Sequence, residues 1–369
     1  MAIEYITAGE SHGEMLAGII KGIPAGLGVD SRFIDGELSR RQLGYGRGER
    51  MNIERDRAKI ISGVINGTSI GSPIAILIDN AARDRADKLT AVRPGHADLS
   101  GAIKYGFSDA SPVAERASAR ETAMRVALGA VAKLYLKTFG IAVESRTVAI
   151  GKVRAEALDS YADINARADK DAVRCIDAAA SKRMRDEIAL AKERGDTLGG
   201  VAEVTASGVV AGIGSYVSSD LRLDGLIMRE VGSVPSVKAV EIGDGIDGST
   251  VFGSEFHDRI YAAENGKYIR MTNRAGGIEG GMTNGERITV RAYFKPVPTL
   301  ANGLDTVDII TGKNVKAAAL RSDVCIVPAG GVAAEAAVAL ALCSALSTVL
   351  GGDTMDEAIE RYRKKRSAE

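Results

Sequence analysis

Residues 112–139 read PVAERASARETAMRVALGAVAKLYLKTF. The stretch is rich in alanine, and apolar side chains crowd along it until Gly140 ends it. This pattern predicts one long helix that is mostly buried. A second alanine-rich, apolar stretch, from about 333 to 350, is closed by Gly351 and predicts another buried helix.

Segments typical of β-strands lie on both sides of these helices in the sequence. Residues 2–9, 72–80, 199–212 and 287–294 are rich in β-branched residues and are bounded by Gly, Asn or Pro, which predicts strands. No linker rich in Pro, Ser or Gly divides the chain. We therefore expect one integrated α+β domain that spans residues 1–369.

Two further features concern the organisation of the chain. Residues 169–195 are charged and rich in alanine, so they predict a solvent-facing helix. Segments 62–76 and 276–290 align without gaps, and each is a glycine-containing turn followed by a strand. This similarity is a weak sign of two related halves.

The composition excludes several classes of protein. A net charge of zero argues against a nucleic-acid-binding protein, which usually carries a basic excess. The cysteines, Cys175, Cys325 and Cys343, form no CxxC pair, as is typical of reduced thiols in a cytosolic protein. The apolar run 336–350 is too short to span a bilayer. We expect a cytoplasmic protein with no secretion signal and no membrane or nucleic-acid partner.

The chain has only three histidines, and two of them lie in turns that contain glycine. His12 lies in GESHG, and His96 lies in RPGHAD next to Arg93. A single histidine in a turn is more often incidental than catalytic. Two such residues beside Ser or Arg favour a functional site.

Arginines cluster in two places. Residues 38–57 place six arginines among glycines, which suits either a charge-balanced surface loop or a loop that binds phosphate and carboxylate groups. Arg116 and Arg120 are four residues apart, so within the predicted helix they would share one face. Because that helix is otherwise apolar, these arginines would need anionic partners, and a ligand could supply them.

A second group of motifs lies near the C-terminus. Residues 273–286 contain two GG pairs that allow close backbone approach to a ligand, and Lys295 in KPVPT adds a cation. In RSDVC, Asp323 next to Arg321 is either part of an ion pair or a base. GDGIDG at 243–248 satisfies GxGxxG, but it places two aspartates where a pyrophosphate would lie, so we reject a dinucleotide site.

Taken together, these segments resemble the chorismate synthase family. The resemblance covers most of the chain, except residues from about 150 to 200. It rests on motifs that follow one another in the same order as in the family: GESHG, GRGER with SGV..G.S.GSPIA, RPGHAD..GAIKYG, ERASARETAMRVA.GAVAK, VKAVEIG, GGIEGGMTNG, KPVPT and RSDVC. It implies a β-α-β sandwich with sheets packed around a helical layer. It also implies a carbon–oxygen lyase that acts on a phosphate ester, at the last step of the shikimate pathway to aromatic amino acids.

The resemblance implies a substrate, a cofactor and an assembly. The substrate would be 5-enolpyruvylshikimate 3-phosphate, which becomes chorismate and phosphate by a 1,4-elimination with reduced FMN. The electrons for the flavin would come either from NADPH or from an external reductase, and the assembly would be a homotetramer. The substrate carries one phosphate and two carboxylates, and FMN adds another phosphate, which accounts for the many arginines.

The resemblance also assigns residues. Substrate anions would contact Arg41, Arg50, Arg93, Arg120 and Arg321. The flavin would contact Arg41, Arg47, Arg116, Ala117, Ser118, Pro235, Ser236, Gly280, Lys295, Pro296, Val297, Pro298, Thr299 and Arg321. His12 would be the acid for the departing phosphate, His96 would protonate or hydrogen-bond the reduced flavin, and Asp323 would act with flavin N5 to remove the C6 proton.

The chain departs from many relatives at a few positions. Pro235-Ser236 replaces Asn-Ala, so flavin contact there would run through the backbone. Ser111 replaces an arginine, and Ser322 replaces a histidine. Two other functions stay open at this point: a flavin oxidoreductase acting on a different substrate, and an RNA-binding protein that uses the arginines of 38–57, which zero net charge and few aromatic residues disfavour.

Overall fold

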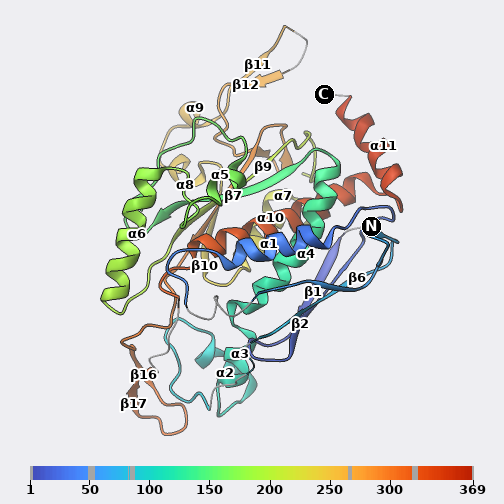
Figure 1. The fold of residues 1–369 in the computed structure, drawn as a ribbon. Helices are drawn as coiled ribbons and strands as arrows, with labels where there is room; N and C mark the ends of the chain where they lie inside the picture. Colours follow the sequence, from blue (N-terminus) through green and yellow to red (C-terminus); the bar gives the residue numbers. More distant parts are fainter. Residues whose placement is uncertain are drawn as a thin grey trace.

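Two antiparallel sheets lie on either side of a layer of helices (Figure 1). The computed structural model describes residues 3–48, 55–81, 83, 88–264, 268–317 and 323–367. One hydrophobic core extends from Ile3 near the N-terminus to Tyr362 in the last helix. This architecture confirms the expected α+β sandwich, in which sheets pack around a helical layer.

The first sheet has four strands in the order β1-β2-β6-β3, and all neighbouring strands are antiparallel. Along β6, the buried Ile74, Ile76 and Ile78 alternate with more exposed residues, so one face of the strand points into the core. The strands are β1 Glu4–Ala8, β2 Met15–Lys21, β3 Lys59–Ser62 and β6 Ile74–Asp79.

The second sheet has five strands in the order β10-β15-β9-β7-β8, also antiparallel. Residues 201–206 of β9 are all buried, so this central strand is covered on both faces. The strands are β7 Ala142–Ile150, β8 Val153–Arg154, β9 Gly200–Ser207, β10 Val237–Ile242 and β15 Ile288–Phe294.

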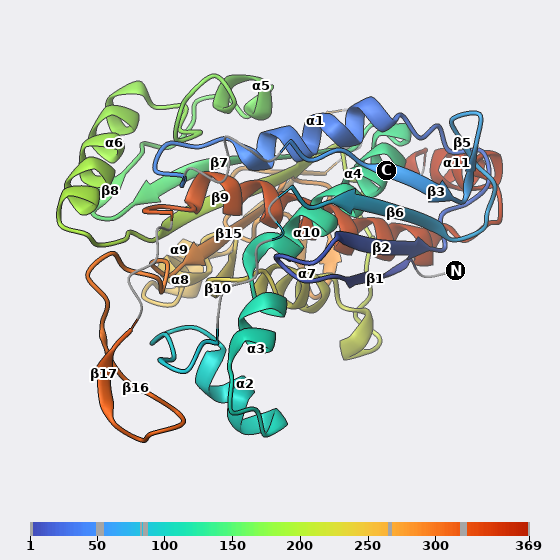
Figure 2. The same ribbon diagram turned by 60° about the horizontal axis from the view of Figure 1, so that its bottom comes forward.

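Four helices form the layer between the sheets: α1 Ser31–Gln42, α4 Thr122–Thr138, α7 Leu223–Gly232 and α10 Val327–Leu350. Helix α4 packs against β2 and β6, whereas α10 packs against β7 and β9, and the two helices contact each other (Figure 2). A Cβ at Gly129 of α4 would lie 2.5 Å from the Cβ of Ala336, so glycine permits the close approach.

Helix α10 is the predicted C-terminal helix, but it begins at Val327, several residues earlier than expected. Among the described residues it is long and apolar enough to cross a membrane, yet 83% of its most apolar window is buried inside the protein. Its sequence is apolar all round because neighbouring elements cover it on every side.

Glu335 places one carboxylate in the middle of α10, and its side chain is fully buried. It accepts hydrogen bonds from Arg40 at 2.9 and 3.0 Å and from Ser145 at 2.6 Å, and it contacts Lys133. Burial opposes the charge, but Arg40, Lys133 and Arg174 outweigh it and hold the pKa of Glu335 well below its usual value. This ion cluster ties α1, α4 and β7 to α10.

A smaller unit, which we call the pocket lobe, comprises residues 88–118 and the hairpin β16–β17. It has its own hydrophobic cluster of Val92, Ala102 and Ala110, flanked by Val307. Thr90 Oγ1 donates to Asp308 at 2.6 Å and links the two parts of the lobe. Its elements are α2 Asp98–Tyr105, α3 Ser111–Arg116, β16 Asp305–Val307 and β17 Asn314–Lys316.

The predicted single helix over 112–139 is wrong. Helix α3 ends at Arg116, a short 3₁₀ turn spans Ala119–Glu121, and α4 begins at Thr122. Ser118 has an extended backbone, and its side chain accepts from the N–H of Arg120, so it caps a new turn and interrupts the helix. Arg116 and Arg120 therefore do not share one helix face.

The predicted helix over 169–195 is shorter than expected. It forms only at α6 Ala178–Glu193, because Asp177 caps its start through the N–H of Ala180. The remaining elements are β4 Val64–Ile65, β5 Thr68–Ser69, β11 Ile260–Ala262, β12 Tyr268–Arg270, β13 Ile278–Glu279, β14 Met282–Thr283, α5 Ile164–Ala168, α8 Gly245–Gly248, α9 Gly253–Phe256, α11 Met355–Arg366 and a 3₁₀ turn at Ser219–Leu221.

The two segments that align in sequence also share their structure. In 62–76 the hairpin β4–β5 precedes β6 of the first sheet, and in 276–290 the hairpin β13–β14 precedes β15 of the second. The element order and spacing are the same in both. The sequence similarity therefore corresponds to one short unit used once in each sheet.

Candidate active site

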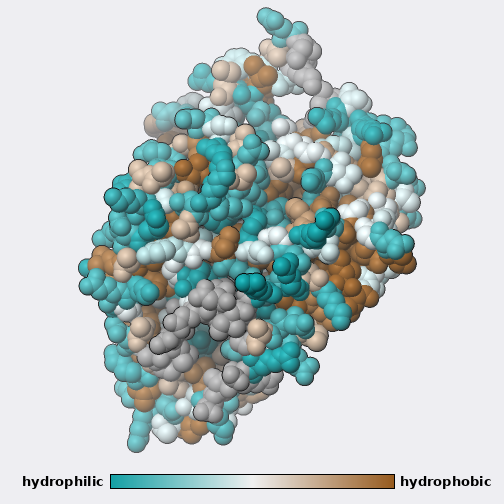
Figure 3. All heavy atoms as spheres, viewed as in Figure 1, coloured by the Kyte–Doolittle hydropathy of each residue, from teal (hydrophilic) through white to brown (hydrophobic). Residues whose placement is uncertain are grey.

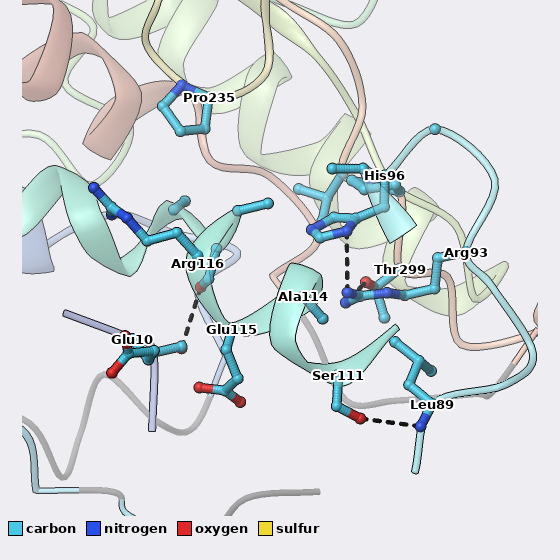
Figure 4. Close-up of a pocket in the computed structure, with 18 of the residues that line it drawn as sticks. Glu10, Leu89, Arg93, His96, Ser111, Ala114, Glu115, Arg116, Pro235 and Thr299 are labelled. Atoms are coloured by element: carbon cyan, nitrogen blue, oxygen red, sulfur yellow. Dashed lines mark hydrogen bonds between the residues drawn. The ribbon is translucent and has the colours of Figure 1, made fainter. Parts of the chain in front are cut away.

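A pocket of about 1150 Å³ is lined by the turn after β1, the pocket lobe, the segment after β15 and the segments just before β10 and α10 (Figure 4). These segments are far apart in the sequence. The pocket brings together most of the predicted site residues: His12, Arg93, His96, Arg116, Ala117, Ser118, Pro235, Ser236, Lys295, Val297, Pro298, Thr299 and Asp323.

His12 enters the pocket from the turn between β1 and β2. This turn is docked onto α3, because the N–H of Ser11 donates to the carbonyl of Glu115 at 3.1 Å. The carboxylate of Glu115 contacts His12 twice: Oε2 accepts from the backbone N–H at 2.7 Å, and Oε1 lies 2.7 Å from ring Nδ1. The imidazole is thus held in a defined orientation.

His96 is the second imidazole of the pocket. Asp98, whose side chain is fully buried, contacts His96 Nδ1 and also accepts from Arg93 Nε at 2.8 Å. Figure 4 shows the side chains of Arg93 and His96 facing each other. Burial opposes the charge of Asp98, but hydrogen bonds and charges from His96 and Arg93 outweigh it, so the pKa of Asp98 lies well below its usual value. Asp98 stays ionised near neutral pH.

Asp323 is the predicted basic carboxylate. It lies just before α10, where Oδ1 accepts from the backbone N–H of Gly48 at 2.6 Å and Oδ2 lies 3.3 Å from Arg47 Nη1. Its side chain is 23% exposed and reaches the pocket. Arg47 contacts this carboxylate, so the arginine-rich stretch 38–57 approaches the pocket at this residue.

Lys295 follows β15, and its ammonium group donates to the carbonyl of Gly95 in the loop that carries His96. Burial, and then the charge of Lys238, lowers its pKa. The N–H of Lys295 donates to the carbonyl of Ser236 at 2.9 Å, and Ser236 has a φ of 73°, a backbone conformation uncommon outside glycine. Lys295 therefore links two segments that line the pocket.

Other predicted residues lie apart from the lining. Arg41 and Arg120 are buried beside Asp56: Arg120 Nη1 lies 2.8 Å from it and Arg41 Nη1 lies 3.5 Å from it. Pro296 and Gly280 also do not line this pocket. Arg50, Arg321 and Ser322 lie outside the residues that the structure describes.

The sequence motifs did not identify the two carboxylates that contact the histidines of the pocket, Asp98 and Glu115. Asp98 had a local signal, since it follows His96 by two residues within RPGHAD. Glu115 had none, because 103 residues separate it from His12 and only the docking of α3 onto the first turn joins them. Ser111 lines the pocket and accepts from the N–H of Leu89 at 3.0 Å.

A metal centre is not indicated here: among the described residues no group of three or more His, Cys, Asp or Glu side chains is arranged to hold an ion. The pocket instead offers imidazoles, carboxylates and cations. Such a set can transfer protons and bind anions.

Comparisons with known proteins show which family this chain is similar to. The sequence profile of the family described as chorismate synthase matches residues 3–347. The chain is 47% identical over 379 residues to a chorismate synthase of Caldicellulosiruptor saccharolyticus, covering 98% of this chain and 99% of that one. It is 48% identical over 385 residues to a chorismate synthase of Symbiobacterium thermophilum, covering 98% of each.

A solved structure points to the same family. The chain resembles a crystal structure of chorismate synthase with a TM-score of 0.83 and 38% identity, over 100% of this chain and 98% of that one. The fold, the order of motifs and the relatives over nearly full length lead to one conclusion: this chain belongs to the chorismate synthase family.

Proposed function

We propose that the pocket lined by His12, His96 and Asp323 is where this chain, as a single catalytic domain, carries out the reaction of its family. That reaction converts 5-enolpyruvylshikimate 3-phosphate into chorismate and phosphate. The observation that supports this location is the convergence of two imidazoles and one carboxylate, from three distant parts of the sequence, in one pocket.

The residues present fit a flavin mononucleotide bound beside the substrate. At about 1150 Å³ the pocket exceeds the range of roughly 300–1,000 Å³ usual for a single ligand. Lys88, Arg93, Arg116 and Lys295 line it, so cations are available for the phosphate groups of both molecules. The reduced flavin, FMN in our proposal, supplies electron density for the loss of phosphate with no net redox change.

The side chains have distinct tasks in the elimination. The C3–O bond breaks, and His12 gives a proton to the departing phosphate. Asp323 takes the proton from C6, and the electron pair of that C–H bond enters the new double-bond system. His96 would protonate or hydrogen-bond the reduced flavin when it is bound. Imidazole and carboxylate groups are among the side chains that most often transfer protons in enzymes.

Anion binding is divided between two sets of residues. Arg93, Arg116 and Lys295 contact ligands directly in this proposal, and Arg50 and Arg321 join them from sequence alone. Arg41 and Arg120 belong to the substrate site by resemblance, and their contacts with Asp56 suggest that they act by supporting the lining.

We also propose a cytoplasmic homotetramer. The hairpin β11–β12 supports an assembly of subunits, because Ile260, Tyr261, Tyr268 and Ile269 are all at least 45% exposed, and apolar side chains gathered in this way are typical of an interface. The number of four subunits rests on the family resemblance. The reductant is either NADPH or an external reductase, and adding NADPH and oxidised FMN to the pure enzyme separates the two.

The function is tested by an anaerobic assay with a catalytic amount of chemically reduced FMN. Chorismate absorbance should rise until the substrate is consumed, with no electron acceptor used in stoichiometric amount. A flavin oxidoreductase acting on another substrate would instead consume one acceptor per turnover and form no chorismate.

A further inference from the structure

In both imidazoles of the pocket, Nδ1 is in hydrogen-bonding contact with a carboxylate. The partner is Glu115 for His12 and Asp98 for His96. Glu115 is the less expected of the two, because it belongs to a different segment from its histidine. Its side chain is only 13% exposed, and α3 holds it against the turn that contains His12.

Both carboxylate oxygens of Glu115 are engaged by His12. One oxygen accepts the backbone N–H of His12, which can only donate. The other oxygen faces Nδ1, and a carboxylate at that place favours the ring form with a proton on Nδ1. Proton exchange with a ligand then runs through Nε2.

We propose that Glu115 is a positioning residue that fixes the Nδ1–H form of His12 and so directs Nε2 to the leaving phosphate. The inference rests on the proposed role of His12. Once Nε2 has given its proton away, the neutral ring carries its proton on Nδ1, and this is the form to which Glu115 is already bonded. The ring therefore needs no rotation between the charged and neutral states.

The substitution Glu115→Gln tests this with little change in shape. A glutamine has one accepting oxygen and one donating amide, so it cannot accept from both the backbone N–H and Nδ1–H of His12. With its oxygen on the backbone N–H, the amide faces Nδ1 and favours the Nε2–H tautomer.

The direct readout is solid-state ¹⁵N NMR of the ligand-free full chain labelled with [¹⁵N]histidine. The chain has only three histidines, and single substitutions assign their ring signals. At about pH 9, above the ordinary imidazole pKa of about 6.5, the parent should show protonated Nδ1 at His12. Glu115→Gln should shift protonation to Nε2 at His12 and leave His96 unchanged.

Two matched variants complete the design. Asp98→Asn should move the ring signals of His96 and leave those of His12 in place. Glu10→Gln removes another carboxylate that lines the pocket and should move neither set. If the His12 signals in Glu115→Gln match the parent, or if Glu10→Gln shifts them equally, the inference is overturned.

Kinetics distinguish positioning from a structural role. Glu115→Gln should lower kcat by roughly 10- to 100-fold, by analogy with the loss of carboxylates that orient metal-binding histidines, with KM for the substrate nearly unchanged. In a His12→Ala background the same substitution should cause no further loss, because Glu115 acts through His12. An additive loss would contradict the inference. If His12→Ala itself kept full activity, the proposed function would fail, while the NMR result would still report on the tautomer.

Discussion

Asp323 and Arg47 form an ion pair with 3.3 Å between Oδ2 and Nη1, and the same carboxylate accepts from the backbone N–H of Gly48 at 2.6 Å. The segment before α10 is therefore joined to the arginine-rich loop. In the sequence, Asp323 suggested either an ion-pair partner or a base. The structure gives it a cation, Arg47, and the ion pair leaves the carboxylate on the pocket lining.

The first prediction concerns the basicity of Asp323. Asp323→Asn keeps an oxygen for Gly48 N–H but removes the basic carboxylate, so substrate and reduced FMN should still bind. The chemical step should slow by about 10²–10⁴-fold. Rapid-mixing measurements with substrate deuterated at C6 should show a larger isotope effect in the variant, because proton removal becomes more fully rate-limiting. Parent turnover in Asp323→Asn would mean that the carboxylate only orients Arg47.

The second prediction separates the two arginines that the sequence had placed on one helix face. Arg120 is buried with Asp56, so Arg120→Ala should lower the free energy of unfolding of the ligand-free protein by roughly 3 kcal/mol, as expected when one partner of a buried ion pair is removed. Arg116 is exposed, and Arg116→Ala should leave that free energy nearly constant and weaken ligand binding.

Urea unfolding without ligand measures both effects. The two variants serve as controls for each other, since each removes one guanidinium group from the same short region. A parent-like unfolding curve for Arg120→Ala, together with lost substrate binding, would show that Arg120 serves the ligand as the family resemblance implies.

The third prediction is a pH dependence. Burial and then Lys238 lower the pKa of Lys295, so in the free enzyme its ammonium group loses its proton at a lower pH than an ordinary lysine. Anion binding that uses this charge should therefore be complete near neutral pH and fade as the pH rises. Lys295→Arg keeps its charge throughout.

Titration of reduced FMN from about pH 7 to about pH 10 checks this, since ordinary lysines still hold their proton over most of that range. Parent affinity should decline with rising pH more steeply than the affinity of Lys295→Arg. Parallel profiles would exclude Lys295 as the titrating cation.

Local patterns in the sequence predicted the elements of the fold well. The strand-like segment 72–80 and the apolar run in 333–350 correspond to β6 and α10. Burial of one face leaves alternating apolar residues, whereas burial of all faces leaves a continuous apolar run. The break at Ser118 was missed because alanine-rich flanks hide a single capping residue. Helix propensity could not reveal it.

The site was predictable to the extent that its residues occur in motifs. His12, His96 and Asp323 all reach one pocket, as the motifs suggested. Partners across the fold left no such signal: Glu115 meets His12, and Asp56 meets Arg120, only after distant segments pack together. A carboxylate in a polar stretch is usually solvated, so sequence alone gave no reason to select these two.

The central claim is that His12 and His96 both serve the reaction in this pocket, and turnover of three single variants tests it most directly. Under anaerobic conditions with reduced FMN and 5-enolpyruvylshikimate 3-phosphate, His12→Ala and His96→Ala should each lower turnover by about 10²–10⁴-fold. His257 is exposed and lies outside the pocket lining, so His257→Ala should behave like the parent. Equal losses at all three positions, or parent activity at His12 and His96, would contradict the account.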